Sequence, residues 1–228
     1  MMLKKLWMAL IALILLVHAS YLLGDDCVQC HAAKGVQEST PAIAPIVIKA
    51  EGKTRSISLS DAFGFHGHSC PGVTTAFRAL QYGILLLYGT EIPEQDDLLI
   101  SSKTPAPGSL DLLDLIMIGE NRKGKTGAPK GMQSRADNFS YTIYRKSTHT
   151  AVDIHLKPEH YPKDFFALKK KQSANTLTSE EWDTLHNYMK TIILTFPSKS
   201  FEDLFDSPQP YKAIIWGNLM PAHGSTLE

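Results

Sequence analysis

The sequence predicts an α+β protein, and three of its segments carry that prediction. Residues 73–88 are almost continuously apolar and are followed by Gly89, a pattern typical of a buried helix with a glycine after its end. Residues 138–146 and 148–157 alternate polar and apolar side chains, as two strands of an antiparallel hairpin do. Residues 178–196 repeat apolar side chains near the helical period. Helices combined with an antiparallel hairpin favour the α+β class.

The composition is that of an ordinary globular protein and argues against several functional classes. Of 228 residues, 43% are hydrophobic and 20% are charged, which does not fit a disordered, collagen-like or multi-span membrane protein. Basic and acidic residues balance at 23 each, so no charge excess points to nucleic acid or to an anionic membrane. Three cysteines are too few for a disulfide scaffold.

The N-terminus has the pattern of an export signal. Two lysines precede an unbroken apolar run at residues 6–17, and Val17-His18-Ala19 suits cleavage after Ala19. Twelve residues span about 18 Å as a helix, less than the roughly 30 Å of a bilayer core. We therefore predict a signal peptide at residues 1–19 and a periplasmic or secreted protein. The alternative is an uncleaved membrane anchor facing the periplasm, because residues 21–23 extend the apolar stretch.

Residues 27–31, Cys-Val-Gln-Cys-His, have the C-x-x-C-H spacing of covalent c-type haem attachment. In that interpretation Cys27 and Cys30 form thioethers with one haem c and His31 is its proximal iron ligand. The alternatives are a disulfide, a redox-active dithiol or half of a zinc site, although no second cysteine pair exists for zinc. Residues 20–58 are too short for a cytochrome domain and are interpreted as a haem-bearing arm and linker. The distal ligand stays open among Met132, His149, His155, His160, His186 and His223.

The segment before the first helix carries a second set of metal-ligand residues. His66, His68 and Cys70 lie within five residues, and Pro71 suits the first turn of a helix, which places Cys70 at or beside its N-cap. We expect the two histidines in an extended segment, with both rings on one side. Two imidazoles and a thiolate fit zinc, and less specifically iron, nickel or copper, with a fourth position open. The alternative is a buried cysteine beside two surface histidines.

The heptapeptide HGHSCPG at residues 66–72, with Arg78 eight residues beyond Cys70, resembles the signature of the E-subunit family of formylmethanofuran dehydrogenase. The order of a helix, an extended segment (97–102), a second helix (109–118) and a hairpin is also similar. The resemblance implies an α+β domain, which we place at residues 59–217. It also implies a metal site, commonly zinc, held by His66, His68 and Cys70, with Arg78 in packing or in the site.

The chain departs from that family where a further cysteine usually opens the second helix and another follows it. Residues 107–111 and 119–125 contain no cysteine, so water, Asp111, Glu120 or the haem-bearing arm would complete the metal shell. No role in methanogenesis carries over to an exported protein.

The remaining segments are predicted to be structural. Residues 121–135 form a basic surface loop without P-loop order, and 218–228 form a tail. On the second hairpin strand His149, Asp153 and His155 make a solvated polar face or complete a site. Thr178 and Glu181 have capping-box spacing, and the helix that follows buries Trp182, Leu185, Met189, Ile192 and Ile193. Residues 211–216 are expected to form a last, buried strand.

Together these features predict an exported, haem c-containing and metal-binding redox protein that exchanges electrons with a partner protein or small molecule. If it is an enzyme, a metal-dependent oxidoreductase is the expected class. A non-catalytic class is the alternative: a periplasmic metal- or ligand-binding or sensor module, in which residues 27–31 form a disulfide or carry a docking haem. Nucleic acid is not an expected partner, and a membrane is one only if the N-terminal segment stays uncleaved.

Overall fold

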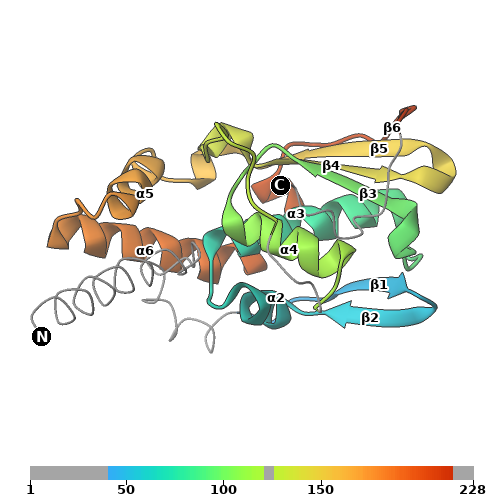
Figure 1. Cartoon of the computed structure of the whole chain (residues 1–228), viewed down its shortest axis with the longest axis horizontal. Coiled ribbons are helices and arrows are strands. Elements are labelled where there is room, and N and C mark those ends of the chain that lie inside the picture. Colours follow the sequence, from blue (N-terminus) through green and yellow to red (C-terminus); the bar gives the residue numbers. More distant parts are fainter. Residues whose placement is uncertain (1–40, 121–125, 218–228) are drawn as a thin grey trace, which may run out of the picture. The chain divides into compact units, whose positions relative to one another are not determined.

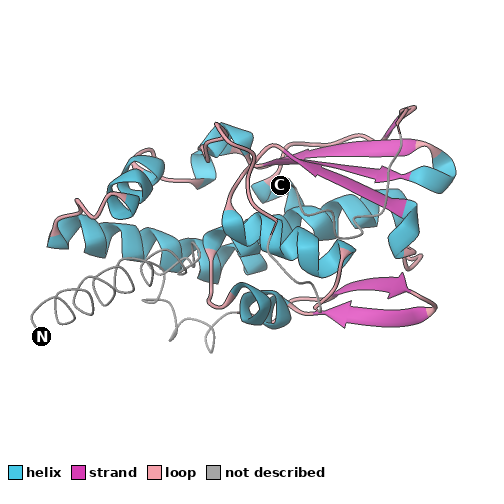
Figure 2. Ribbon diagram, viewed as in Figure 1, coloured by secondary structure: helices cyan, strands magenta, loops and turns pink. Residues whose placement is uncertain are grey.

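The computed structural model describes residues 41–120 and 126–217, which belong to one compact unit. The predicted signal peptide, the haem motif with Cys27, Cys30 and His31, and the tail at 218–228 lie outside the described residues. The described part contains helices together with antiparallel sheets, so the predicted α+β class is confirmed (Figure 2). Within it, no helix has the length and apolarity needed to cross a membrane.

A two-stranded hairpin precedes the helices and was not predicted. Strands β1 (Ile46–Ala50) and β2 (Lys53–Ile57) pair antiparallel around a two-residue turn at Glu51 and Gly52. Both turn residues have positive φ, which matches the type I′ turn that suits the twist of paired strands. The hairpin is part of the core through the buried side chains of Ile46, Ile48 and Ile57. Part of the segment interpreted as a linker is therefore packed structure.

Helix α3 (Pro71–Tyr88) is the central element and follows the shorter helix α2 (Leu59–His66). It contacts β4 and β5 of the larger sheet, and also α2, α4 and α6 (Figure 1). At Gly83 the helix comes so close to the sheet that a Cβ would lie 2.5 Å from Cδ1 of Ile143. A larger side chain at residue 83 would have to displace the end of the Ile143 side chain, so glycine suits the point where α3 crosses the sheet.

The larger sheet has the order β3-β4-β5-β6, with every neighbouring pair antiparallel. Its strands are β3 (Leu98–Ser102), β4 (Ser140–Arg145), β5 (Thr150–His155) and β6 (Tyr211–Lys212). The predicted hairpin at 138–157 is confirmed as β4 and β5, and the predicted extended segment as β3. Side chains of the two middle strands enter the core, among them Tyr141, Ile143, Val152 and Ile154.

The remaining helices are α4 (Pro107–Met117), α5 (Phe165–Ser173), α6 (Ser179–Thr195) and α7 (Phe201–Leu204). Helix α4 confirms the predicted second helix and begins two residues before the expected start. In α6 the reciprocal capping box of Thr178 and Glu181 is present, as predicted. The helix buries Leu185, Met189, Ile192 and Ile193, while Trp182 is half-buried.

The prediction of a last, buried strand at 211–216 is wrong. Strand β6 has two residues, pairs only with Thr150 and Ala151 at the sheet edge, and is exposed. The apolar residues after it are exposed as well, Ile214 at 68% and Trp216 at 84%. An apolar run indicates burial only where a partner surface covers it, and no described element covers this one.

Candidate metal centre

The first candidate ligand, His66, is the last residue of α2 and does not lie in the extended segment that we expected. Ser58 begins this helix with a reciprocal capping box to Asp61, a signal that the sequence analysis missed. Gly67 ends the helix in the left-handed conformation, with φ 98°, and its N–H donates to the carbonyl of Phe63. Because the chain reverses at Gly67, the next residues return toward the end of α2.

Cys70 is the N-cap of α3, as the sequence predicted. Its backbone is extended, Pro71 occupies the first turn of the helix, and the carbonyl of Cys70 accepts the N–H of Thr74. No side chain caps this end of α3. The thiol therefore lies at the positive end of a long helix, which favours a thiolate.

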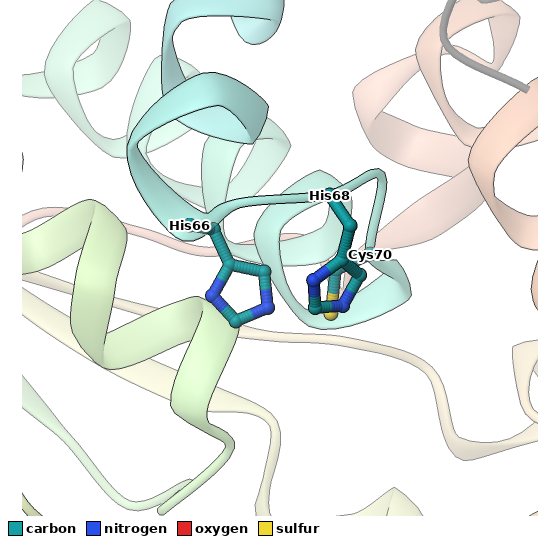
Figure 3. A group of neighbouring side chains, drawn as sticks. All are labelled: His66, His68 and Cys70. Carbon is teal, nitrogen blue, oxygen red and sulfur yellow. The ribbon is translucent and has the colours of Figure 1, made fainter. Parts of the chain in front are cut away.

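His66, His68 and Cys70 come together in the structure (Figure 3). The two imidazole rings lie side by side with their centroids 4.3 Å apart. One candidate ligand atom from each of the three residues lies within 4.8 Å of the other two. His66 is buried, whereas His68 and Cys70 are half-buried. Among the described residues this is the one group of histidine, cysteine and carboxylate side chains with metal-site geometry.

Asp111 of α4 lies behind His66. Its Oδ2 is 2.6 Å from Nδ1 of His66, and both side chains are almost completely buried, with 4% and 2% exposure. The opposite nitrogen of His66, Nε2, is buried and has no hydrogen-bond partner. A carboxylate on one ring nitrogen and an unsatisfied buried nitrogen on the other are what a metal-binding histidine presents.

The electrostatics of the group favour a paired imidazolium and thiolate. Burial acts to lower the pKa of His66, but the hydrogen bond that Nδ1 donates to the Asp111 carboxylate and the nearness of the Cys70 sulfur outweigh it and raise the pKa to about 10. Burial acts to raise the pKa of Cys70, but the closeness of the His66 and His68 imidazoles to its sulfur holds the pKa well below the usual value. The thiolate, which is the form that binds metals, is thus the stable form of Cys70.

The residues present fit a divalent metal. Two histidine nitrogens and one cysteine sulfur form a donor set that zinc accepts in tetrahedral geometry. Three protein ligands leave one position for water or an external ligand, as in catalytic rather than structural zinc sites. The fold brings together the three residues that the resemblance implies as metal ligands.

The other residues suggested for the metal shell make different contacts. Asp111 supports His66 from behind and does not belong to the clustered ligand atoms. Glu120 lines a cavity together with Arg55 and Asp61. Arg78 is 8% exposed, donates to the carbonyl of Lys199 at 2.7 Å and lies over the ring of Phe201. These contacts give Arg78 a packing role between α3 and the C-terminal segment.

The polar face of the second hairpin strand does not join the metal group. The hydroxyl of Tyr144 lies 3.0 Å from Nδ1 of His149, and Asp153 accepts from Thr142 and Tyr211. Of the candidate distal haem ligands, Nε2 of His160 donates to the carbonyl of Asp203 and Met132 is exposed. His223 and the haem motif itself lie outside the described residues.

Comparison with known protein families gives a match over most of the described fold. The family described as FmdE, molybdenum formylmethanofuran dehydrogenase operon, matches residues 65–206. The matched region begins just before His66 and ends just beyond α7, so it contains the whole candidate metal centre. No curated protein matches the chain. Because the match covers more than half of the 228 residues, the chain belongs to the FmdE family.

Proposed function

We propose that this member of the FmdE family binds one divalent metal ion through His66, His68 and Cys70, and that zinc is the ion its donors suit best. The observation that carries the proposal is the convergence of three ligand atoms within 4.8 Å, in front of the buried Asp111 carboxylate. Bound zinc would supply a Lewis acid with one open position. The three residues would hold the ion, and Asp111 would orient His66.

The finer part of the proposal is that the protein is exported and carries one haem c on the arm at residues 20–58. The apolar run at 6–17 and the C-x-x-C-H spacing of Cys27, Cys30 and His31 support it. Haem exchanges single electrons, whereas zinc does not change its oxidation state. With zinc, electrons would therefore pass between the haem and a redox partner protein or a small molecule. Iron or copper at the site could take part directly.

The second candidate function is a non-catalytic one: a periplasmic metal- or ligand-binding or sensor module. If the bound ion is zinc, the donor set favours this non-catalytic function, because zinc has no redox chemistry of its own. In this case Cys27 and Cys30 form a disulfide or carry a haem used for docking.

The first experiment is the intact denatured mass of the protein, expressed with its own N-terminus in a host that attaches c-type haem. A mass equal to residues 20–228 plus one haem is expected, since cleavage after Ala19 and two thioethers both contribute to it. The mass of the apo chain, lower by two hydrogens, would overturn the haem proposal and leave a metal-binding domain with a disulfide.

The second experiment is metal analysis of the purified protein and three variants. His68→Ala and Cys70→Ser are expected to lose the bound metal and to retain the haem. His160→Ala is the matched control, because His160 contacts the carbonyl of Asp203 and not the metal group. Full metal occupancy in the first two variants would refute the site. A redox change of the haem that depends on an added substrate would then separate the redox function from the binding function.

A further inference from the structure

We propose that α4 is the positioning helix of the metal centre: Gly108 sets the space around the sulfur of Cys70, and Asp111 orients His66. The proposal deepens the proposed function and rests on it. Residues three apart on a helix share one face, so both contacts come from one side of the first turns of α4. Neither residue would touch the metal.

The contact between Asp111 and His66 selects the metal-binding nitrogen. Nδ1 of His66 lies 2.6 Å from the carboxylate, and this pair is almost completely removed from solvent. When Nδ1–H donates to Asp111, only Nε2 is left to bind a metal, and Nε2 is the buried atom without a hydrogen-bond partner. The carboxylate also makes the imidazole a stronger donor and fixes the plane of its ring.

The contact between Gly108 and Cys70 limits the space around the sulfur. A Cβ at Gly108 would lie 2.9 Å from Sγ of Cys70 and 2.9 Å from Cγ2 of Val73, which are closer than real Cβ contacts. The first turn of α4 can therefore reach the sulfur only because residue 108 has no side chain. Helix α4 begins without a side-chain cap, as α3 does. The positive ends of two helices thus face the region of the thiolate.

These contacts explain why a seven-residue motif is not sufficient for the site. Residues 66–72 supply the donors, but the residues that orient His66 and confine the sulfur are about 40 positions further along the chain. Ligands held in a fixed geometry bind a metal without the loss of conformational freedom that a flexible loop would suffer.

The test uses the full-length protein and Co²⁺ as the probe, because cobalt with a thiolate ligand gives an absorption band. Asp111→Asn keeps the size of the side chain and removes its charge, and we expect a roughly 10–100-fold loss of Co²⁺ affinity. Asp114→Asn is the matched control. Asp114 is a buried aspartate on the same helix, but it accepts hydrogen bonds from Thr126, so Co²⁺ affinity should be unchanged.

Gly108→Ala tests the second contact. The new methyl group would crowd the sulfur of Cys70 as well as Val73, so the cobalt–thiolate band is expected to weaken or shift. Gly83→Ala is its control, since that methyl group would press on Ile143 and not on the sulfur. It should lower stability and leave the band unchanged. In the zinc-loaded wild type, ¹⁵N spectra should report Nε2 of His66 as the metal-bound nitrogen and Nδ1 as protonated.

The outcomes separate the two proposals. A wild type that shows no cobalt–thiolate band overturns the proposed function, and the positioning role of α4 with it. A wild type that binds Co²⁺ while Asp111→Asn binds it equally well, or a spectrum with the metal on Nδ1, overturns the role of Asp111 alone. An unchanged band in a folded Gly108→Ala variant overturns the role of Gly108.

Discussion

Helix α3 meets the rest of the fold through two surfaces of different character. On the side that we call the sheet side, the contact is apolar and very close, with Gly83 against Ile143 and Ile154. On the α4 side, polar contacts occur beside apolar ones such as that of Gly108 with Val73. The hydroxyl of Ser109 donates to the carbonyl of Gly72 at 3.1 Å, and Gly108 lies against the sulfur of Cys70.

The difference indicates that the two surfaces have different roles. Close apolar packing contributes to the stability of the whole fold, and it tolerates no change in volume without loss. Buried polar contacts contribute little net stability, but they specify one arrangement of the groups that make them. Changes on the sheet side should therefore alter folding without altering metal binding, and changes to the α4 residues that contact His66 and Cys70 should alter metal binding.

The largest expected effect is stabilisation by the metal itself. A ligand that binds only the folded state stabilises it by about 2.7 kcal/mol when present at 100 times its Kd. We expect wild-type protein to gain this increment with zinc, measured by chemical denaturation with and without a chelator. Cys70→Ser should lose the increment. Gly83→Ala should keep it, and a variant of the sheet side that lost it would contradict this difference in roles.

The next effect concerns the sheet side alone. The methyl group of Gly83→Ala would overpack the contact with Cδ1 of Ile143, so unfolding free energy should fall by about 1–3 kcal/mol. Ile143→Val removes that Cδ1 atom, and the double variant should recover part of the loss in a double-mutant cycle. Additive losses would mean that the two residues do not share this contact.

The sheet side is also the part of the fold that the sequence predicts best. The apolar stretch at 73–88 and the alternation at 138–157 are local patterns, and each fixes an element and its buried face. Two elements could not be predicted in this way. The β1–β2 hairpin depends on Glu51 adopting positive φ before Gly52. The exposure of residues 211–216 depends on which neighbours happen to cover them, and a local pattern contains no information on that.

In the metal centre, too, some residues can be predicted from local sequence and others cannot. The donors His66, His68 and Cys70 are visible in the sequence because they lie within five residues and match a family signature. Their supports are not visible. Asp111 could be named as a possible ligand, but only the fold places its carboxylate on Nδ1 of His66, 45 residues away. Gly108 follows a proline in an ordinary helix start, and nothing in the sequence connects it with the sulfur.

The third effect is the pH dependence of zinc binding, which arises on the α4 side. Zinc displaces the proton from Nε2 of His66, whose pKa is raised to about 10, while Cys70 is already a thiolate. Zinc affinity should therefore rise about tenfold per pH unit from pH 7 to 9, and level off above 10. Calorimetry in buffers of different ionisation enthalpy measures the proton released. In Asp111→Asn the zinc affinity should stop rising at a lower pH, because the carboxylate that raises the pKa of His66 has been removed. In Gly83→Ala the zinc affinity should stop rising at the same pH as in the wild type.

The same shifts act on the metal-free protein with opposite signs. The raised pKa of His66 stabilises the fold fully below its ordinary value of 6.5, and this contribution is lost as the pH rises toward 10. The lowered pKa of Cys70 stabilises the fold above its ordinary value of 9.0, and this contribution is lost as the pH falls. Between pH 6.5 and pH 9 the two trends oppose each other, so the stability of the metal-free protein should decline above pH 9, where only the His66 contribution is changing, and also below pH 6.5, where only the Cys70 contribution is changing.

The last pair of effects lies at the junction of the two sides, where the hydroxyls of Ser109 and Tyr141 are 2.9 Å apart and buried. Tyr141→Phe removes one hydrogen bond, and Ser109 still donates to Gly72, so the loss should be about 0.5–1.5 kcal/mol. Ser109→Ala leaves the Tyr141 hydroxyl without this partner and should cost more, about 1–3 kcal/mol. Chemical denaturation of both variants in the presence of a chelator measures which of them loses more unfolding free energy. An equal loss in the two, or a larger one in Tyr141→Phe, would mean that Ser109 does not link the sheet to the first turn of α4.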